Sequence, residues 1–186
     1  MISWASTCRF ILTKVMGWTI DTSHAPEQKC VLIGVPHTSA WDFVVSYLYY
    51  RSTGKKARVM VKKEMFVWPL GGLLKKLGAI PVDRSSGAAV TKSVISHMRD
   101  ADEFHLAIAP EGTRKPVRKW KTGYHTIAKG VGCPVYLCYF DWGTKHVGYA
   151  RKFDLTDDAR SDTDRMQAEY EEMHLVGKHP EYFITK

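Results

Sequence analysis

Apolar and polar positions along the chain fall into two alternating kinds of segment. Short apolar runs that end at glycine, proline or charged residues predict strands over residues 29–35, 57–61, 79–82, 104–109, 134–140 and 146–153. Segments with apolar residues every three or four positions predict helices over residues 40–50, 70–77, 87–99, 123–129 and 162–176. Because strands and helices alternate, we expect an α/β fold, with a mostly parallel sheet flanked by helices.

The first twenty residues carry a helical pattern of their own. One face of this predicted amphipathic helix, over residues 1–20, would carry Trp4, Cys8, Ile11, Leu12, Val15 and Trp18. The run is shorter than the roughly 18 uninterrupted apolar residues that a membrane-spanning helix needs. Two interpretations stay open: a helix packed on the protein, or a helix lying in a membrane interface. Residues 29–186 are expected to form a single domain.

Composition adds a basic surface to this picture. The chain has 186 residues, of which 45% are hydrophobic and 25% charged, so a globular domain is expected rather than a disordered chain. Residues 1–150 contain 21 lysines and arginines against 10 acids, whereas residues 151–186 contain 6 against 9. The first 150 residues should therefore attract an anionic partner. The four cysteines form no CxxC pair, which favours reduced thiols over a disulfide framework.

A histidine and a carboxylate follow the first predicted strand. His37 and Asp42 lie where that strand gives way to a helix, a position at which α/β proteins place ligand-binding groups. A neutral imidazole can act as a general base, and a carboxylate can orient it and stabilise its protonated form. On one continuous helix the two side chains would point about 140° apart. They can meet only if His37 lies in the loop and Asp42 in the first helical turn.

A second interpretation of this pair is purely structural. Ser39 and Asp42 match a capping box, in which a serine caps the helix and an acid three residues later bonds back. In that case Asp42 would only start the helix, and His37 would be an ordinary loop residue. The sequence of this stretch alone leaves both interpretations open.

Two further predicted strand ends carry polar groups. Glu111, Gly112, Thr113 and Arg114 follow the strand over residues 104–109, and Arg84 follows the strand over residues 79–82. A glycine, a hydroxyl and a guanidinium suit a phosphate or another oxyanion, although a solvated basic loop has a similar composition. The carboxyl ends of parallel strands share one edge of a sheet, so these groups are expected to lie near His37 and Asp42.

Four blocks therefore occur in order along the chain. They are HTSAWD at 37–42, KEMF through GAIPVDR at 63–84, EGTR at 111–114 and CPVYL at 133–137. In order and spacing they resemble the HxxxxD, second, EGTR and fourth motifs of the glycerolipid (lysophosphatidate-type) acyltransferases. The resemblance covers roughly residues 30–140.

The resemblance implies an O-acyltransferase similar to the 1-acylglycerol-3-phosphate O-acyltransferases. Such an enzyme moves a fatty acyl group from an acyl-CoA or acyl carrier protein thioester to the hydroxyl of a lysophospholipid-like acceptor. His37 would be the general base and Asp42 its orienting partner. Arg84 and Arg114 would match phosphate contacts, with the acceptor site shaped by Glu111, Gly112 and Thr113.

The same resemblance implies the setting of the reaction. We expect a peripheral protein on the cytoplasmic face of a membrane, with no cofactor beyond the thioester co-substrate and no nucleic-acid partner. The histidines show no metal-ligand spacing, so no metal is expected.

Two competing functions remain. An acyl ester or thioester hydrolase could use the same dyad, but the two arginines would then have no clear function. A non-catalytic basic module for membranes or nucleic acid would explain the charge, but not Asp42 and Glu111.

Overall fold

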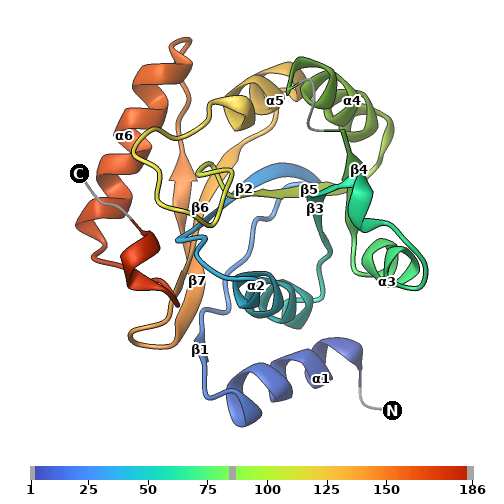
Figure 1. Cartoon of the computed structure of the whole chain (residues 1–186), viewed down its shortest axis with the longest axis vertical. Coiled ribbons are helices and arrows are strands. Elements are labelled where there is room, and N and C mark those ends of the chain that lie inside the picture. The colour runs from blue at the N-terminus through green and yellow to red at the C-terminus, as the bar shows by residue number, and fades with distance from the viewer. Residues whose placement is uncertain (1–2, 84–86, 184–186) are drawn as a thin grey trace.

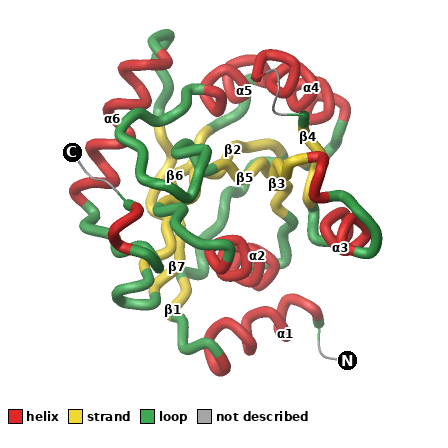
Figure 2. Tube along the Cα trace, viewed as in Figure 1, coloured by secondary structure: helices red, strands yellow, loops and turns green. Residues whose placement is uncertain are grey.

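The structure, a computed structural model, describes residues 3–83 and 87–183 of the chain. In this part of the chain seven strands form one sheet in the order β1-β7-β6-β2-β5-β3-β4. Helices surround the sheet, as the tube in Figure 2 shows by the red segments around the yellow ones. The strands are β1 (Thr19–Ile20), β2 (Lys29–Val35), β3 (Ala57–Lys62), β4 (Ala79–Val82), β5 (Phe104–Ile108), β6 (Val135–Asp141) and β7 (His146–Phe153). The helices are α1 (Trp4–Phe10), α2 (Trp41–Ser52), α3 (Leu70–Lys76), α4 (Gly87–Asp100), α5 (Gly123–Val131) and α6 (Ala159–Glu172).

The sheet is mostly parallel, which confirms the predicted fold class. Every strand pair is parallel except β6 with β7. β2 lies in the middle of the sheet, with Ile33 opposite Ile108 of β5 on one side and Leu137 of β6 on the other. The carboxyl ends of β2 and β5 are therefore direct neighbours.

Two hydrophobic layers cover the two faces of this sheet. β2 supplies both, because its alternate residues point to opposite faces: Val31 and Ile33 to one layer, Cys30 and Leu32 to the other. The first layer is covered by α4, α5 and α6, and the second by α1 and α2. Figure 1 shows α4 and α5 on one side of the sheet, with α1 and α2 on the other.

The N-terminal helix is shorter than the predicted span of residues 1–20. α1 ends at Phe10, a single π-helical turn continues to Val15, and the chain then joins the sheet edge as β1. Of the predicted apolar face, Cys8, Leu12 and Trp18 are buried, the first two against α2 and its neighbours. Trp4 (52% exposed), Phe10 (60%) and Val15 (67%) face solvent. The packed interpretation therefore holds for one side of this segment, while these three apolar side chains stay exposed.

The remaining predicted elements are present with shifted ends. The last helix, predicted over residues 162–176, is α6 over Ala159–Glu172. Its start is set by Asp158, whose side chain accepts hydrogen bonds from the amides of Arg160 and Ser161 (2.9 Å each). The sequence analysis missed the two-residue strand β1 and the 3₁₀ turns at Lys63–Met65 and Pro180–Tyr182, which are too short to show a period.

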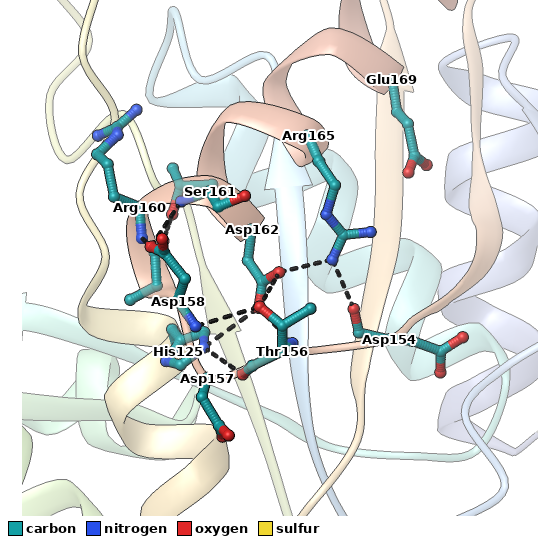
Figure 3. Close-up of polar contacts among 12 residues, drawn as sticks. His125, Asp154, Thr156, Asp157, Asp158, Arg160, Ser161, Asp162, Arg165 and Glu169 are labelled. Atoms are coloured by element: carbon teal, nitrogen blue, oxygen red, sulfur yellow. Dashed lines mark hydrogen bonds and ion pairs between the residues drawn. The ribbon is translucent and has the colours of Figure 1, made fainter.

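A buried carboxylate joins α6 to α5 (Figure 3). Asp162 is fully buried and accepts hydrogen bonds from the Thr156 amide (2.6 Å), the Thr156 hydroxyl (2.9 Å) and Arg165 (2.6 Å). Its Oδ2 also lies 3.2 Å from Nε2 of His125 on α5, a nitrogen that is 3.1 Å from the Thr156 carbonyl. This second histidine–carboxylate pair is enclosed by protein groups, so its role is to anchor the fold.

Replacing Asp162 by alanine should strongly destabilise the protein. The change removes the buried acceptor of the Thr156 amide and hydroxyl and leaves the buried His125 without its carboxylate partner, which should lower the free energy of unfolding by about 2–4 kcal/mol. Denaturant titration would measure the loss. Asp157→Ala is the matched control, because Asp157 is fully exposed and pairs with Lys129 on the surface. Equal midpoints for the two variants would contradict the anchoring role.

Candidate active site

His37 lies in the loop between β2 and α2, and Asp42 lies in the first turn of α2. This is the arrangement that the sequence required for the two side chains to meet. Nδ1 of His37 is 3.5 Å from Oδ2 of Asp42, with the imidazole 29% exposed and the carboxylate 1% exposed. The carboxylate is thus on the protein side of the imidazole. Nε2 is left as the ring nitrogen that can meet a substrate.

The Asp42 carboxylate is held from two directions. Oδ2 accepts hydrogen bonds from the amides of Thr38 (2.7 Å) and Ser39 (2.6 Å). Oδ1 accepts a hydrogen bond from the indole Nε1 of Trp142 (2.8 Å). The start of a helix also favours a negative charge. These bonds fix the carboxylate in one orientation against His37.

The catalytic and helix-capping interpretations of this stretch are compatible. The predicted capping box is not complete: α2 begins at Trp41 with Ala40 at its N-cap, so Ser39 lies one residue before the cap. The Ser39 amide still donates to Asp42, as in a capping box, but the Ser39 hydroxyl accepts from the Trp41 amide (3.2 Å). The capping bond and the approach to His37 use the same carboxylate oxygen. Capping therefore helps to hold the carboxylate beside the imidazole.

Glu111 reaches the same loop from the neighbouring strand. It follows β5, and its carboxyl oxygens accept from the backbone amide of His37 at 2.8 and 3.2 Å. Burial raises the pKa of Glu111 to about 8, although the His37 amide lowers it; the nearby charge of Asp42 raises it further. Glu111 thus positions the backbone of His37 in this structure, a role that sequence reasoning had not assigned to it.

The three other residues of this block form an exposed loop. Gly112 has φ +70°, a left-handed backbone conformation that glycine adopts without strain and most other residues do not. The Thr113 hydroxyl accepts from the Lys115 amide (3.1 Å), and the Arg114 side chain is exposed. The Lys121 amide donates to the Pro110 carbonyl (2.8 Å) and closes the loop. The expected cationic surface therefore borders Glu111.

Arg84 lies outside the described residues. The strand before it, β4, ends at the same edge of the sheet, but β5 and β3 separate it from β2. At the usual spacing between strands this is about 14 Å. Asp83, the last residue described before Arg84, pairs with Lys63.

Sequence reasoning missed two parts of the site. Trp142 follows β6, and only its position just beyond a strand end could have marked it. The segment after α6 also returns to the site: the Trp142 amide donates to the Val176 carbonyl (2.8 Å), and the His179 amide donates to the Thr38 hydroxyl (3.2 Å). Between these contacts, Nζ of Lys178 lies 4.3 Å from the Trp142 ring centroid. The acidic C-terminal region thus supports the site loop.

Three further observations on residues 3–83 and 87–183 concern metal ligands, cavities and membrane-spanning helices. No group of three or more histidines, cysteines or acids there could hold a metal ion. Two cavities, of about 240 and 530 Å³, are lined by residues of the C-terminal segment and of β6 and β7, and neither is lined by His37, Asp42 or Glu111. Within the same ranges no helix has the length and apolar character needed to cross a membrane.

Replacing Glu111 by glutamine should change how stability depends on pH. With a pKa of about 8 in the folded protein and about 4.3 in the unfolded chain, Glu111 binds a proton preferentially in the folded state between these values. Wild-type stability should therefore fall as pH rises through this window. Glu111→Gln removes this titration. As pH rises through the window, the free energy of unfolding of the variant should therefore increase relative to that of the wild type by up to about 1.4 kcal/mol per pH unit. Denaturant titrations at several pH values would measure the difference, and a constant difference would contradict the raised pKa.

One family of known proteins matches most of the chain. No curated protein matches the chain. A family model described as Acyltransferase matches residues 19–141, a range that contains His37, Asp42 and the whole Glu111–Arg114 block. The match covers well over half of the 186 residues. It confirms the family suggested by the sequence motifs: the chain belongs to the glycerolipid acyltransferase family.

Proposed function

We propose that the chain transfers a fatty acyl group from an acyl-CoA or acyl carrier protein thioester to the hydroxyl of a lysophospholipid-like acceptor, as 1-acylglycerol-3-phosphate O-acyltransferases do. Family membership supports acyl transfer in general. The observation that carries the finer proposal is the His37–Asp42 pair, which is held at the sheet edge with one ring nitrogen toward the protein and the other free. No cofactor other than the thioester co-substrate is needed.

In the proposed reaction His37 is the general base. Nε2 takes the proton of the acceptor hydroxyl as that oxygen attacks the thioester carbonyl. The C–S bond of the tetrahedral intermediate then breaks, and the acyl group stays on the acceptor oxygen as an ester. The proton on Nε2 passes to the departing thiolate, which leaves as a thiol. Asp42 faces Nδ1 and stabilises the imidazolium between the two proton transfers.

The acceptor is proposed to lie along the Glu111–Arg114 loop. Arg114 is exposed at the rim, and its planar guanidinium suits the phosphate of a lysophospholipid. Arg84 is proposed to contribute a second phosphate contact. Gly112 and Thr113 would shape the space between the rim and His37, while Glu111 holds the backbone of His37 in place.

A lipid acceptor requires access to a membrane. We propose that the protein acts peripherally, on the cytoplasmic face of a membrane, and that its basic surface meets anionic groups there. Nucleic acid is not among the proposed partners.

Replacing His37 by alanine should reduce acyl transfer by about 10²- to 10⁴-fold, because the general base is lost. The assay would supply a labelled long-chain acyl thioester and lysophosphatidate, and measure label in the diacyl lipid. His97→Ala is the control, because His97 is an exposed histidine on α4. Free fatty acid formed without dependence on the acceptor would contradict the proposal and indicate a hydrolase. No turnover, with tight nucleic-acid binding, would indicate a non-catalytic module.

Replacing Trp142 by phenylalanine should lower kcat by roughly tenfold and leave both KM values within about twofold, because the hydrogen bond to the Asp42 carboxylate is lost while an aromatic ring stays at this position. Trp18→Phe is the control. Trp18 packs edge-on against Trp142, but the hydrogen bond to Asp42 comes from Trp142. Thermal melts would verify that both variants fold. Equal kcat values for the two variants would show that the indole N–H does not position Asp42.

A further inference from the structure

The connection between β3 and β4 exposes an unusual amount of apolar side chain. Five residues form what we term the apolar platform: Met65 (47% exposed), Val67 (60%), Trp68 (93%), Leu70 (37%) and Leu73 (54%). All five fall within nine consecutive positions of the sequence. Large contiguous apolar surfaces on proteins mark interaction sites, whereas singly scattered ones do not. The platform is therefore a candidate interaction surface.

The turn that carries the platform is tightly folded. The Phe66 amide donates to the Lys63 carbonyl (3.0 Å), and the Gly71 amide donates to the Val67 carbonyl (2.7 Å). A Cβ on Gly71 would lie 2.7 Å from the Phe66 carbonyl oxygen, so the backbone closes on itself at this glycine. Trp68 is thus presented by an ordered turn, and its exposure is a property of the fold.

The platform starts at the edge of the sheet that carries the site. β3 ends at Lys62, and its neighbour β5 leads directly to Glu111. The next strand, β2, leads to His37, so the end of β3 is two strands, or about 10 Å, from the end of β2. Figure 1 shows α3 projecting sideways from the sheet beyond β3 and β4. A flat partner on the platform would therefore lie beside the site.

Positive charges flank the platform on both sides. Residues 62–76 contain four lysines, Lys62, Lys63, Lys75 and Lys76, against one acid, Glu64. All four lysines are exposed, although Lys63 pairs with Asp83. An apolar centre with a tryptophan, bordered by lysines, matches the layers of an anionic membrane surface. The tryptophan suits the boundary between headgroups and acyl chains, and the lysines suit the headgroups.

We infer that the apolar platform docks the protein on an anionic phospholipid bilayer, with the site edge facing the lipid. The inference rests on the proposed function in one respect, since a lipid acceptor gives the docking its purpose. An acidic carrier protein is the other anionic partner to consider. It would be expected to contact clustered cations, whereas here the cations stand at the two ends and the apolar side chains occupy the middle.

The test compares full-length variants in co-sedimentation with vesicles. The probes are phosphatidylcholine vesicles with and without phosphatidylglycerol. The wild type should bind the anionic vesicles better, and the double variant W68S/L73S should bind them roughly tenfold more weakly, because it removes apolar area from the contact. The variant K75Q/K76Q should bind more weakly, with a smaller dependence on salt. W4S/F10S is the matched control on α1, since it removes a similar exposed area elsewhere.

Three results would overturn the inference. The first is wild-type affinity for anionic vesicles in W68S/L73S. The second is an equal loss of affinity in W68S/L73S and W4S/F10S, which would show that any exposed aromatic area gives the same binding wherever it lies. Absent vesicle binding by the wild type would also overturn it, and loss of affinity for an acidic acyl carrier protein in W68S/L73S would then assign the platform to that partner. Circular dichroism melts should show that every variant folds.

A second readout separates this inference from the proposed function. With a water-soluble short-chain acyl thioester and a monomeric acceptor, W68S/L73S should turn over at the wild-type rate, because no membrane is involved. His37→Ala should lose turnover and still bind anionic vesicles as the wild type does. Full turnover in His37→Ala would refute the proposed catalysis without affecting the docking result.

Discussion

The burial of the Asp42 carboxylate is the constraint on which this site depends. A carboxylate that is fully removed from water is costly unless its oxygens accept hydrogen bonds. Its donors come from separate parts of the chain: two amides of the β2–α2 loop and the indole of Trp142 beyond β6. Satisfying one carboxylate therefore brings together the loop, the helix start and a distant strand end. His37 is oriented as a consequence.

Two acids hold the same histidine in different ways. Asp42 faces the imidazole and accepts three N–H groups, whereas Glu111 accepts the single backbone amide of His37. Burial raises the pKa of Glu111, the single amide donor from His37 lowers it, and the neighbouring charge of Asp42 raises it further. Asp42 thus contacts the side chain of His37, and Glu111 contacts its backbone, so His37 is held at two points.

The acidic C-terminal region packs on the sheet and on the loop that carries His37. α6 is tied to the fold by Asp162 and by Tyr170, whose hydroxyl donates to the carbonyls of Ile33 (3.0 Å) and Cys138 (2.9 Å) in β2 and β6. The segment after α6 then bonds to Thr38 and places Lys178 over Trp142. A region that carries no recognisable motif therefore contacts the residues on both sides of the His37–Asp42 pair.

The sequence by itself determined the secondary structure, the α/β class and the motifs from His37 to Arg114. These depend on local spacing. The period of the apolar residues in one element predicts which of its faces will be buried, and a motif consists of residues that lie close together in the sequence. Only the tertiary structure decided that β5 lies beside β2, that Trp142 reaches Asp42 and that Glu111 holds the His37 backbone. It also decided that Trp68 stays in solvent. Each of these depends on contacts between residues far apart in the chain, or on the absence of a covering element, and periodicity along one segment carries no information about what packs against it.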